Sequence, residues 1–397
     1  MDFSGICVSA FSVVSEGRRM KRCIAAFSDR STQIGQTLSF DDVYERIRGN
    51  GEKPLLIIFA SDYDNFSLYA GLFGEKFPDT QVMGMTSFTS TSSEGLGQQG
   101  LSALAVYEGI ECAGGVLKDA GRCPILHKKE AEKAIAALGI SESDKGKVCC
   151  LGFTTAYGSC EEPVLDTLRS AAGNLDIPFF GSTAGVRRGT ERSRVSLNGE
   201  LYEDACVFMY IRNTAGRIAF LRENTYKHTD NFVLITGVDC ERRIVREING
   251  RPAAPYMASL LRTDVPVFAK NAILHPIGRI YDDNIYIADA KKVGQDLSVS
   301  FFSHIYNLSR AVLLEPDDAN ACGKRLIGKV KDTGISPSFT IAVNCAFDYD
   351  IFADKGFDKD FSKHLTDTVG CFVGMSGCGE QIDNIHVNKT MLLAMFE

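Results

Sequence analysis

The sequence has no apolar run long enough to cross a membrane, no Cys-x-x-Cys pair and no extended basic segment. The apolar residues 6–14 fall well short of the roughly 18 that a spanning helix needs, and basic residues follow this run rather than precede it, unlike those of a signal peptide. The net charge of −7 disfavours a surface for nucleic acid or for an anionic membrane. We therefore expect a cytoplasmic protein with no membrane span and no nucleic-acid partner.

The sequence also lacks the spacings that gather metal ligands. Its thirteen cysteines are an odd number and several lie inside apolar runs, which is typical of buried thiols in a reduced cytosol. No two histidines show His-x-His or His-x-x-x-His spacing. They are dispersed at His127, His228, His275, His304, His364 and His386. We expect no metal site and no cofactor.

Three strand-helix-strand units are present, and each ends in a Gly-x-Ser/Thr loop. In each unit an apolar strand, a helical stretch and a second strand occupy about thirty residues before the loop, which is the length that such a unit needs. The units span residues 55–87, 148–184 and 339–377. Loops at the ends of strands in an open α/β layer can present backbone N–H groups and hydroxyls to a ligand.

Further strands follow each loop. Residues 103–107 with 113–117, and 205–210 with 215–221, predict two hairpins, whereas the third unit keeps only its final strand at 391–396. We interpret the repetition, at a period of roughly 95 residues, as duplication of a β-α-β-β-β unit. The predicted fold is α/β (α+β mixed), with mixed β-sheets layered with helices and two lobes.

Several short motifs resemble a known family. They are Ile-Asn-Gly-Arg-Pro-Ala at 248–253, the loop at 179–185 followed by a strand pair, and Gly-Met-Ser-Gly-Cys-Gly-Glu at 374–380 with Asn-Lys-Thr at 388–390. Together they resemble the FIST family, the F-box and intracellular signal transduction domains. The resemblance implies sensing, because the family is regarded as a small-ligand-binding module of signalling proteins, with amino acids as proposed ligands and haem binding in some members.

The resemblance covers about residues 22–397. It implies an N-terminal FIST domain at 22–222 and a C-terminal FIST domain at 223–397, after an N-terminal extension at 1–21. The first loop, residues 84–89, has a larger and more apolar tip than the family pattern. No recognisable output module is present, so any signal would pass through a separate signalling protein or an unrecognised activity.

The three loops are the predicted ligand site. Glycine allows close approach of the backbone to a ligand carboxylate or phosphate, and the adjacent hydroxyls supply further donors. The alternative is that Gly-Ser-Thr loops after strands are ordinary turns. The candidate ligand-binding residues are Gly84, Thr86, Ser87, Gly181, Ser182, Thr183, Gly374, Ser376 and Asn344.

A catalytic interpretation needs a nucleophile with a base. Cys378 beside Glu380 and His386 is the candidate group, and Cys345 at the end of a strand is a second thiol. Both cysteines are also explained as structural residues. The paired acids 161–162, 282–283 and 317–318 fall at helix starts or turns, where local N–H groups explain them.

The sequence therefore favours a cytosolic sensory protein that binds a small polar molecule, such as an amino acid or a similar metabolite, and signals through a partner. The alternatives are an enzyme of unknown reaction that uses the group at Cys378, and a protein-interaction scaffold. Haem is a further possibility by family analogy only, with His275 as the axial ligand.

Overall fold

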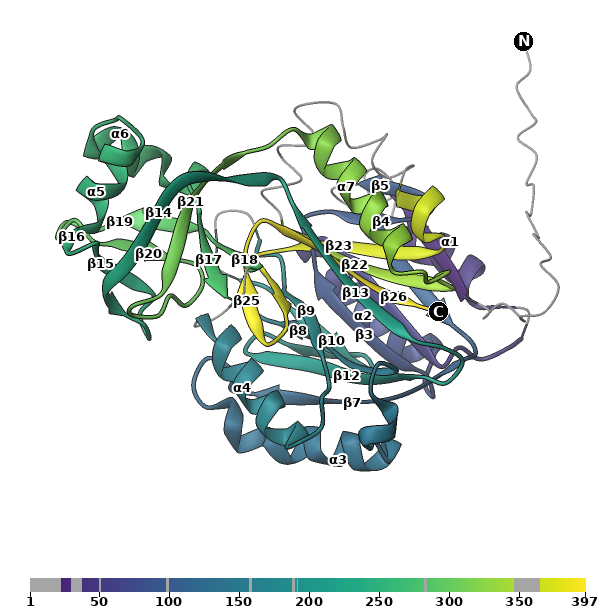
Figure 1. Cartoon of the computed structure of the whole chain (residues 1–397). Helices are drawn as coiled ribbons and strands as arrows, with labels where there is room; N and C mark the ends of the chain where they lie inside the picture. The colour runs from purple at the N-terminus through teal and green to yellow at the C-terminus, as the bar shows by residue number, and fades with distance from the viewer. Residues whose placement is uncertain are drawn as a thin grey trace, which may run out of the picture.

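The structure is a computed structural model that describes residues 23–29, 38–49, 51–97, 100–156, 159–187, 190, 192–281, 284–345 and 365–397. Figure 1 shows a larger body and a smaller lobe that carries α5, α6 and the strands around them. The predicted extension at 1–21, His364 and the acids at 282–283 lie outside the described residues. The expected mixed α and β architecture is confirmed.

The first unit of the body contains six strands and two helices. Its helix α2 begins where the Asp62 side chain accepts the N–H groups of Asp64 and Asn65, and it buries Phe66 and Phe73 at helical spacing. In chain order the elements are β1 (Cys23–Ser28), α1 (Leu38–Ile47), β2 (Leu56–Ser61), α2 (Tyr63–Lys76), β3 (Gln81–Thr86), β4 (Ser90–Ser92), β5 (Gly95–Gly97) and β6 (Leu101–Val106).

The second unit repeats this order. Its helix α3 ends at Gly139, which adopts the left-handed conformation that glycine favours. The elements are β7 (Ile110–Lys118), the 3-10 helix η2 (Pro124–His127), α3 (Lys128–Leu138), η3 (Glu142–Asp144), β8 (Val148–Thr154), α4 (Glu161–Ala172), β9 (Phe179–Thr183), β10 (Val195–Leu197), β11 (Glu200–Tyr202) and β12 (Ala205–Asn213).

The third unit follows the same order, with an insertion between its first strand and its first helix. A helical stretch at 365–369 precedes its second parallel strand. The elements are β13 (Ile218–Asn224), α7 (Ala319–Asp332), β22 (Phe339–Cys345), β23 (Phe372–Gly377), β24 (Glu380–Ile382), β25 (Ile385–Val387) and β26 (Thr390–Phe396). The expectation that this unit keeps only its final strand is wrong, because β24 and β25 form the hairpin that the other two units also have.

The three units exchange their hairpins in a cycle. The sheet orders are β1-β6-β2-β3-β10-β11, β7-β12-β8-β9-β24-β25 and β13-β26-β22-β23-β4-β5. In each sheet a parallel pair lies at the centre, and the outer hairpin comes from another unit: the second supplies the first, the third supplies the second, and the first supplies the third. Each unit is therefore completed by its neighbour. Duplication as the origin of this repetition stays a prediction.

The two predicted hairpins after the loops are wrong. Strand β6 pairs with β1 and β2, and β7 pairs with β12, so β6 and β7 belong to different sheets. Likewise β13 pairs with β26 at the edge of the third sheet. The turn after β6 and the turn after β12 thus carry the chain from one unit to the next. Such a connection can have the same turn residues as a hairpin, so the local sequence does not distinguish the two.

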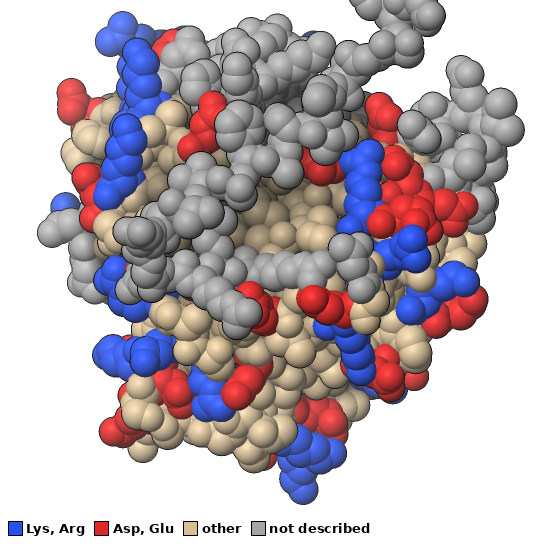
Figure 2. All heavy atoms as spheres, turned by 90° about the vertical axis from the view of Figure 1, so that its right-hand side faces the viewer, with Lys and Arg blue, Asp and Glu red and all other residues tan. Residues whose placement is uncertain are grey.

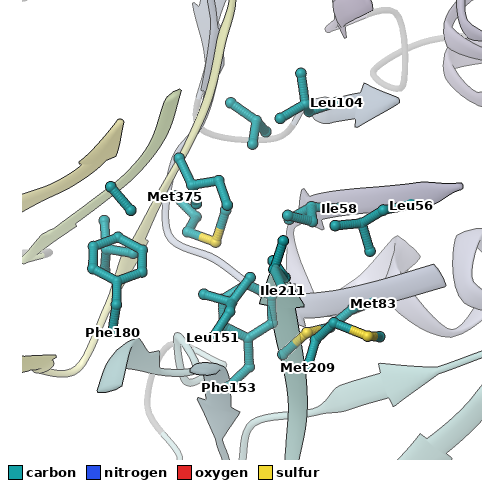
Figure 3. Packing of buried hydrophobic residues seen from close by; sticks show 14 of the residues in the cluster. Leu56, Ile58, Met83, Leu104, Leu151, Phe153, Phe180, Met209, Ile211 and Met375 are labelled. Carbon is teal, nitrogen blue, oxygen red and sulfur yellow. The ribbon is translucent and has the colours of Figure 1, made fainter. Parts of the chain in front are cut away.

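The inner faces of the three sheets share one apolar core. In β2 the alternate residues Leu56 and Ile58 face this core, whereas Ile57 and Phe59 pack beneath α1 and α2. Figure 3 shows side chains of all three sheets in this core, with Ile58 from the first sheet, Leu151 and Phe180 from the second and Met375 from the third. Because both faces of these strands are covered, their sequences are continuously apolar.

The insertion forms the smaller lobe, with its own apolar core. Long strand β14 leads into it, and the chain returns through β21 to α7 (Figure 1). The predicted boundary at 222/223 falls inside β13, and residues 339–396 return to the body. The elements are β14 (Tyr226–Asp239), β15 (Ile244–Ile248), β16 (Arg251–Pro252), α5 (Ala253–Leu260), α6 (Val265–Asn271), η5 (Ala272–Leu274), β17 (Ile277–Tyr281), β18 (Asn284–Ala288), β19 (Ala290–Val293), β20 (Val299–Phe301) and β21 (Arg310–Pro316).

Acidic and basic side chains alternate on the surface. On the face in Figure 2, red and blue groups lie interspersed around a tan centre, without a broad area of either sign among the residues that the figure colours. Within the described ranges, no helix is both long and apolar enough to pass through a bilayer.

Candidate functional site

The three glycine-containing loops meet at one place, as the sequence predicts. Their backbones form a ring of three equivalent hydrogen bonds, in which the N–H of one loop donates to the carbonyl oxygen of the next. Phe88 donates to Ser376 at 3.0 Å, Gly185 donates to Thr86 at 2.6 Å, and Cys378 donates to Thr183 at 2.8 Å. The ring lies at the ends of β3, β9 and β23, the second strands of the three parallel pairs, and links the three units there.

The loop glycines are required by packing. A Cβ at Gly181 would lie 2.1 Å from the Gly152 carbonyl oxygen, and one at Gly84 would overlap the Phe59 ring. All three predicted glycines lie inside paired strands, with Gly84 in β3, Gly181 in β9 and Gly374 in β23. Their place in the sheet ladders gives them a structural role, because close strand or ring contact leaves no room for a side chain.

The loop hydroxyls bond to neighbouring loops. Thr86 Oγ1 donates to the Gly185 carbonyl at 2.7 Å, Ser182 Oγ donates to the Gly379 carbonyl at 3.2 Å, and Ser87 Oγ donates to the Ser376 carbonyl at 3.1 Å. Ser376 Oγ shares a hydrogen bond with Thr89, and all of these side chains are buried. Asn344 lies in β22, where its Oδ1 accepts the Cys345 N–H. Ligand binding by these residues stays a prediction.

A buried ion cluster joins the body to the inserted lobe. Arg243, in the turn between β14 and β15, donates through Nη2 to Glu161 Oε2 at 2.7 Å and to a carboxylate oxygen of Glu162. Only 5% of the Arg243 side chain is exposed. Burial raises the pKa of Glu161, but the Arg243 charge and its hydrogen bond hold this pKa at about 2. The pair is therefore ionised at neutral pH.

These two acids were expected to be explained by local N–H groups at a helix start, and that explanation is incomplete. They do begin α4, where the helix dipole favours negative charge, but the Cys160 N-cap makes no side-chain cap and the carboxylates bind Arg243 from the other lobe. The adjacent acids Glu161 and Glu162 were the only part of the cluster that the sequence pattern marked. Nothing in the sequence pointed to Arg243, because the acids that it binds lie some eighty residues earlier in the chain.

The cluster continues into the body through neutral groups. Thr183 donates its hydroxyl to Glu161 Oε1 at 3.0 Å and accepts from Gln381 Nε2 at 2.9 Å. The same Gln381 nitrogen lies 3.1 Å from His386 Nδ1, within hydrogen-bond distance. Burial lowers the pKa of His386, in agreement with a neutral ring. The hairpin β24-β25 is thus bonded to the ion cluster by its side chains.

A second arginine fixes the backbone around the cluster. Arg279, on β17, is fully buried and donates to the carbonyl oxygens of His304 at 2.7 Å and His386 at 2.6 Å. The His304 N–H in turn donates to Glu162 Oε1 at 2.7 Å. Arg279 therefore connects the inserted lobe to hairpin β24-β25 independently of Arg243.

A cavity of about 400 Å³ lies at the opposite end of α4. Its lining includes Leu168, Phe179 and Tyr210, with Asp383 and Asn384 from the turn of hairpin β24-β25. The Tyr210 side chain is almost fully buried, and its hydroxyl meets the Cys150 thiol, a weak hydrogen-bonding group, but makes no regular hydrogen bond among the described residues. A buried hydroxyl without a regular hydrogen bond is costly unless a ligand or water satisfies it.

The cavity and the ion cluster share two structural elements. Helix α4 begins at Glu161 in the cluster and ends beside the cavity, whose lining includes its residues Leu168 and Ala172. Hairpin β24-β25 bonds the cluster through Gln381 and reaches the cavity with its turn. Figure 1 shows α4 next to β25, and β8 next to β9. A group bound in the cavity would therefore touch both elements that hold the cluster.

The catalytic candidates lie close in sequence but have different surroundings. Burial raises the pKa of the Cys378 thiol to about 12, so it is protonated at neutral pH and is a poor nucleophile. Glu380 is fully buried and accepts the Thr390 N–H, while His386 faces Gln381. Cys345 is buried at the end of β22, as its apolar neighbours predict. An enzymatic role stays an untested alternative.

Haem ligation by His275 stays an expectation from family analogy. Burial and the charge of Lys389 lower the pKa of this half-buried histidine, and it lines neither the cavity beside Tyr210 nor a second hollow of about 730 Å³ between the first two units. Across the described ranges, no group of three His, Cys, Asp or Glu side chains is placed to hold a metal ion.

Residues 54–251 match the family model of the FIST N domain. FIST domains are sensory domains of signal transduction. The match extends from the residues before β2 to the start of β16, so it includes Glu161 and Arg243 as well as Tyr210. Both acids and the arginine of the ion cluster, together with most of the cavity lining, thus lie within the matched residues. No curated protein matches the chain, and the C-terminal FIST domain stays an expectation from the resemblance.

Proposed function

We propose that the protein is a cytosolic sensor of signal transduction that binds a small polar molecule, an amino acid or a similar metabolite, in the cavity at the end of α4. The observation that carries this proposal is a cavity of about 400 Å³ whose lining includes Tyr210, a residue with a buried hydroxyl that makes no regular hydrogen bond among the described residues. That volume is within the usual range for small-molecule sites. The FIST N match supports the sensory class, and the ligand and the partner are our inference.

The chemistry of the lining suits a zwitterion with an apolar side chain. Arg169 can pair with a carboxylate. Asp176 and Asp383 can pair with an ammonium group if their exposed ion pairs with Lys145 and Arg222 open. Leu168 and Phe179 offer apolar contact.

The signal would be a change in how the two lobes are held. A ligand that contacts the end of α4 and the turn at Asp383 prefers one arrangement of these elements, and their other ends hold the cluster around Arg243. The position of the inserted lobe then reports occupancy to a separate signalling protein.

The test is thermal unfolding of the purified full chain with a panel of amino acids, carboxylates and nucleotides. Because a ligand that binds only the folded state stabilises it, at least one amino acid or related metabolite should raise Tm in a concentration-dependent way. No shift with any compound at millimolar concentration contradicts the proposal.

Two tyrosine variants locate the site. Tyr210→Phe removes only the cavity hydroxyl, so the ligand-induced shift should fall strongly while the unliganded Tm changes little. Tyr69→Phe is the matched control, because the Tyr69 hydroxyl is also buried without a regular hydrogen bond among the described residues, but Tyr69 lies on α2 in the first unit. Equal ligand responses in the two variants would place the site elsewhere.

A further inference from the structure

Two cysteines far apart in sequence lie together where the first and third sheets meet. Cys23 is the first residue of β1, an edge strand, and Cys371 immediately precedes β23. The Cys23 sulfur lies 3.1 Å from the carbonyl oxygen of Ser338, and the Thr340 N–H donates to the backbone carbonyl oxygen of Cys371 at 2.9 Å. Both contacts place the two thiols at the same end of the parallel pair β22-β23.

The two sulfurs also contact each other. The Cys371 sulfur lies within hydrogen-bonding reach of the Cys23 thiol and also accepts the N–H of Ala25 on β1. These two hydrogen bonds lower the pKa of Cys371, although burial raises it. Both cysteines are in the thiol form and both are partly exposed. This combination differs from that of Cys112, a partly exposed thiol whose pKa burial raises to about 12.

We propose that Cys23 and Cys371 form a reversible disulfide when the protein meets a peroxide, making this junction a redox-modification site. The Cys371 thiolate attacks one peroxide oxygen, which forms an S–O bond and breaks the O–O bond, and the leaving hydroxide takes up a proton. The Cys23 sulfur then attacks the Cys371 sulfenic acid, the S–S bond forms and water leaves. The two thiols are oxidised and hydrogen peroxide is reduced to two water molecules.

The disulfide would tie β1 to the strands of the third unit. It joins residues from near both ends of the described chain across two sheets that otherwise meet through packing and through hairpin β4-β5. The closed loop would stabilise the folded body by restricting the unfolded chain. The site is independent of the ligand cavity, so either proposal can fail alone.

The test is peptide mapping of the purified full chain after hydrogen peroxide, without reductant. A linked peptide that contains Cys23 and Cys371 should form first, and dithiothreitol should reverse it and lower Tm to its starting value. At neutral pH, iodoacetamide should alkylate Cys371 at least about tenfold faster than Cys112 in the untreated protein.

Serine variants complete the test. In Cys23→Ser the sulfenic acid of Cys371 should persist and react with dimedone, whereas Cys112→Ser should form the linked peptide as wild type does. Absence of the 23–371 peptide in wild type, or its appearance only together with oxidation of Cys112, overturns the proposal. Because the decisive map uses the wild-type chain, a variant that fails to fold does not affect the result.

Discussion

Arg243 Nη2 lies 2.7 Å from Glu161 Oε2, and both side chains are almost fully buried. This contact joins a turn of the inserted lobe to the first residue of α4 in the body. Arg243 has a φ of 54°, a left-handed conformation that costs energy for a residue with a side chain. The surrounding contacts therefore hold the backbone in place so that the guanidinium reaches the two carboxylates.

Replacing Arg243 should destabilise the protein strongly. Arg243→Met leaves two buried carboxylates without their cation, so we expect a loss of about 3–5 kcal/mol in the free energy of unfolding, measured with urea. Arg246→Met is the matched control on the same hairpin, because its ion pair with Asp296 is half exposed. The control should lose less than about 1 kcal/mol. Equal losses would show that the buried cluster contributes no more than a surface pair.

Acid should weaken the fold in two steps. Burial lowers the pKa of His386 below 6.5, so the unfolded chain binds more protons than the folded one below about pH 6.5, and stability falls as the pH falls through that range. Glu161, with a folded pKa of about 2, stabilises the protein above pH 4.5, and this contribution is lost as the pH falls from 4.5 to 2. Urea midpoints between pH 7.5 and 3 measure both steps.

The first step can be assigned with a histidine variant. His386→Asn keeps an acceptor for Gln381 but cannot titrate, so its stability should depend less on pH between 6.5 and 5, by up to about 1.4 kcal/mol per pH unit. His228→Asn, on the exposed surface of β14, should leave the wild-type slope unchanged. A wild-type slope in the His386 variant would assign the step to another group, such as His304.

Much of the body could be predicted from the sequence, because its signals are local. The continuous apolar run of β2 and the helical spacing of Phe66 and Phe73 indicated the first unit, and the recurrence of Gly-Ser/Thr loops indicated that their tips come together. The hairpin exchange could not be predicted, since whether β10 pairs with its own unit or with β3 depends on how three units pack. The same limit applies to Arg243, because a turn arginine has the same local pattern whether it faces solvent or a buried acid.

Replacing a glycine with alanine should lower the free energy of unfolding in β9 and raise it in α2. Gly181→Ala places a Cβ 2.1 Å from the Gly152 carbonyl oxygen, so the two central strands of the second sheet must separate, at a cost of about 1–3 kcal/mol or more. Gly71→Ala, on the exposed face of α2 with no atom near its Cβ, should gain about 0.5–1 kcal/mol from helix propensity. Urea unfolding of both variants measures the difference, and a neutral Gly181→Ala would remove close strand contact as the reason for this glycine.

Ligand binding and the ion cluster should influence each other. If a ligand in the cavity near Tyr210 favours one arrangement of α4 and hairpin β24-β25, then a change in the cluster must alter ligand affinity by the same coupling free energy. We expect Arg243→Met to change the affinity of a ligand found in the thermal panel by at least about fivefold, measured by titration calorimetry at a temperature where the variant is folded.

Hydrogen exchange provides the reciprocal measurement on the unmodified protein. The Arg243 N–H is bonded to the Cys240 carbonyl in the turn that enters the cluster, so the ligand should change its exchange rate. The amides of β1 and β6, on the far side of the common core, should serve as the internal reference and stay the same. If the ligand binds but alters neither the turn exchange nor the affinity in Arg243→Met, then the cavity and the inserted lobe are uncoupled and the signal leaves the protein by another surface.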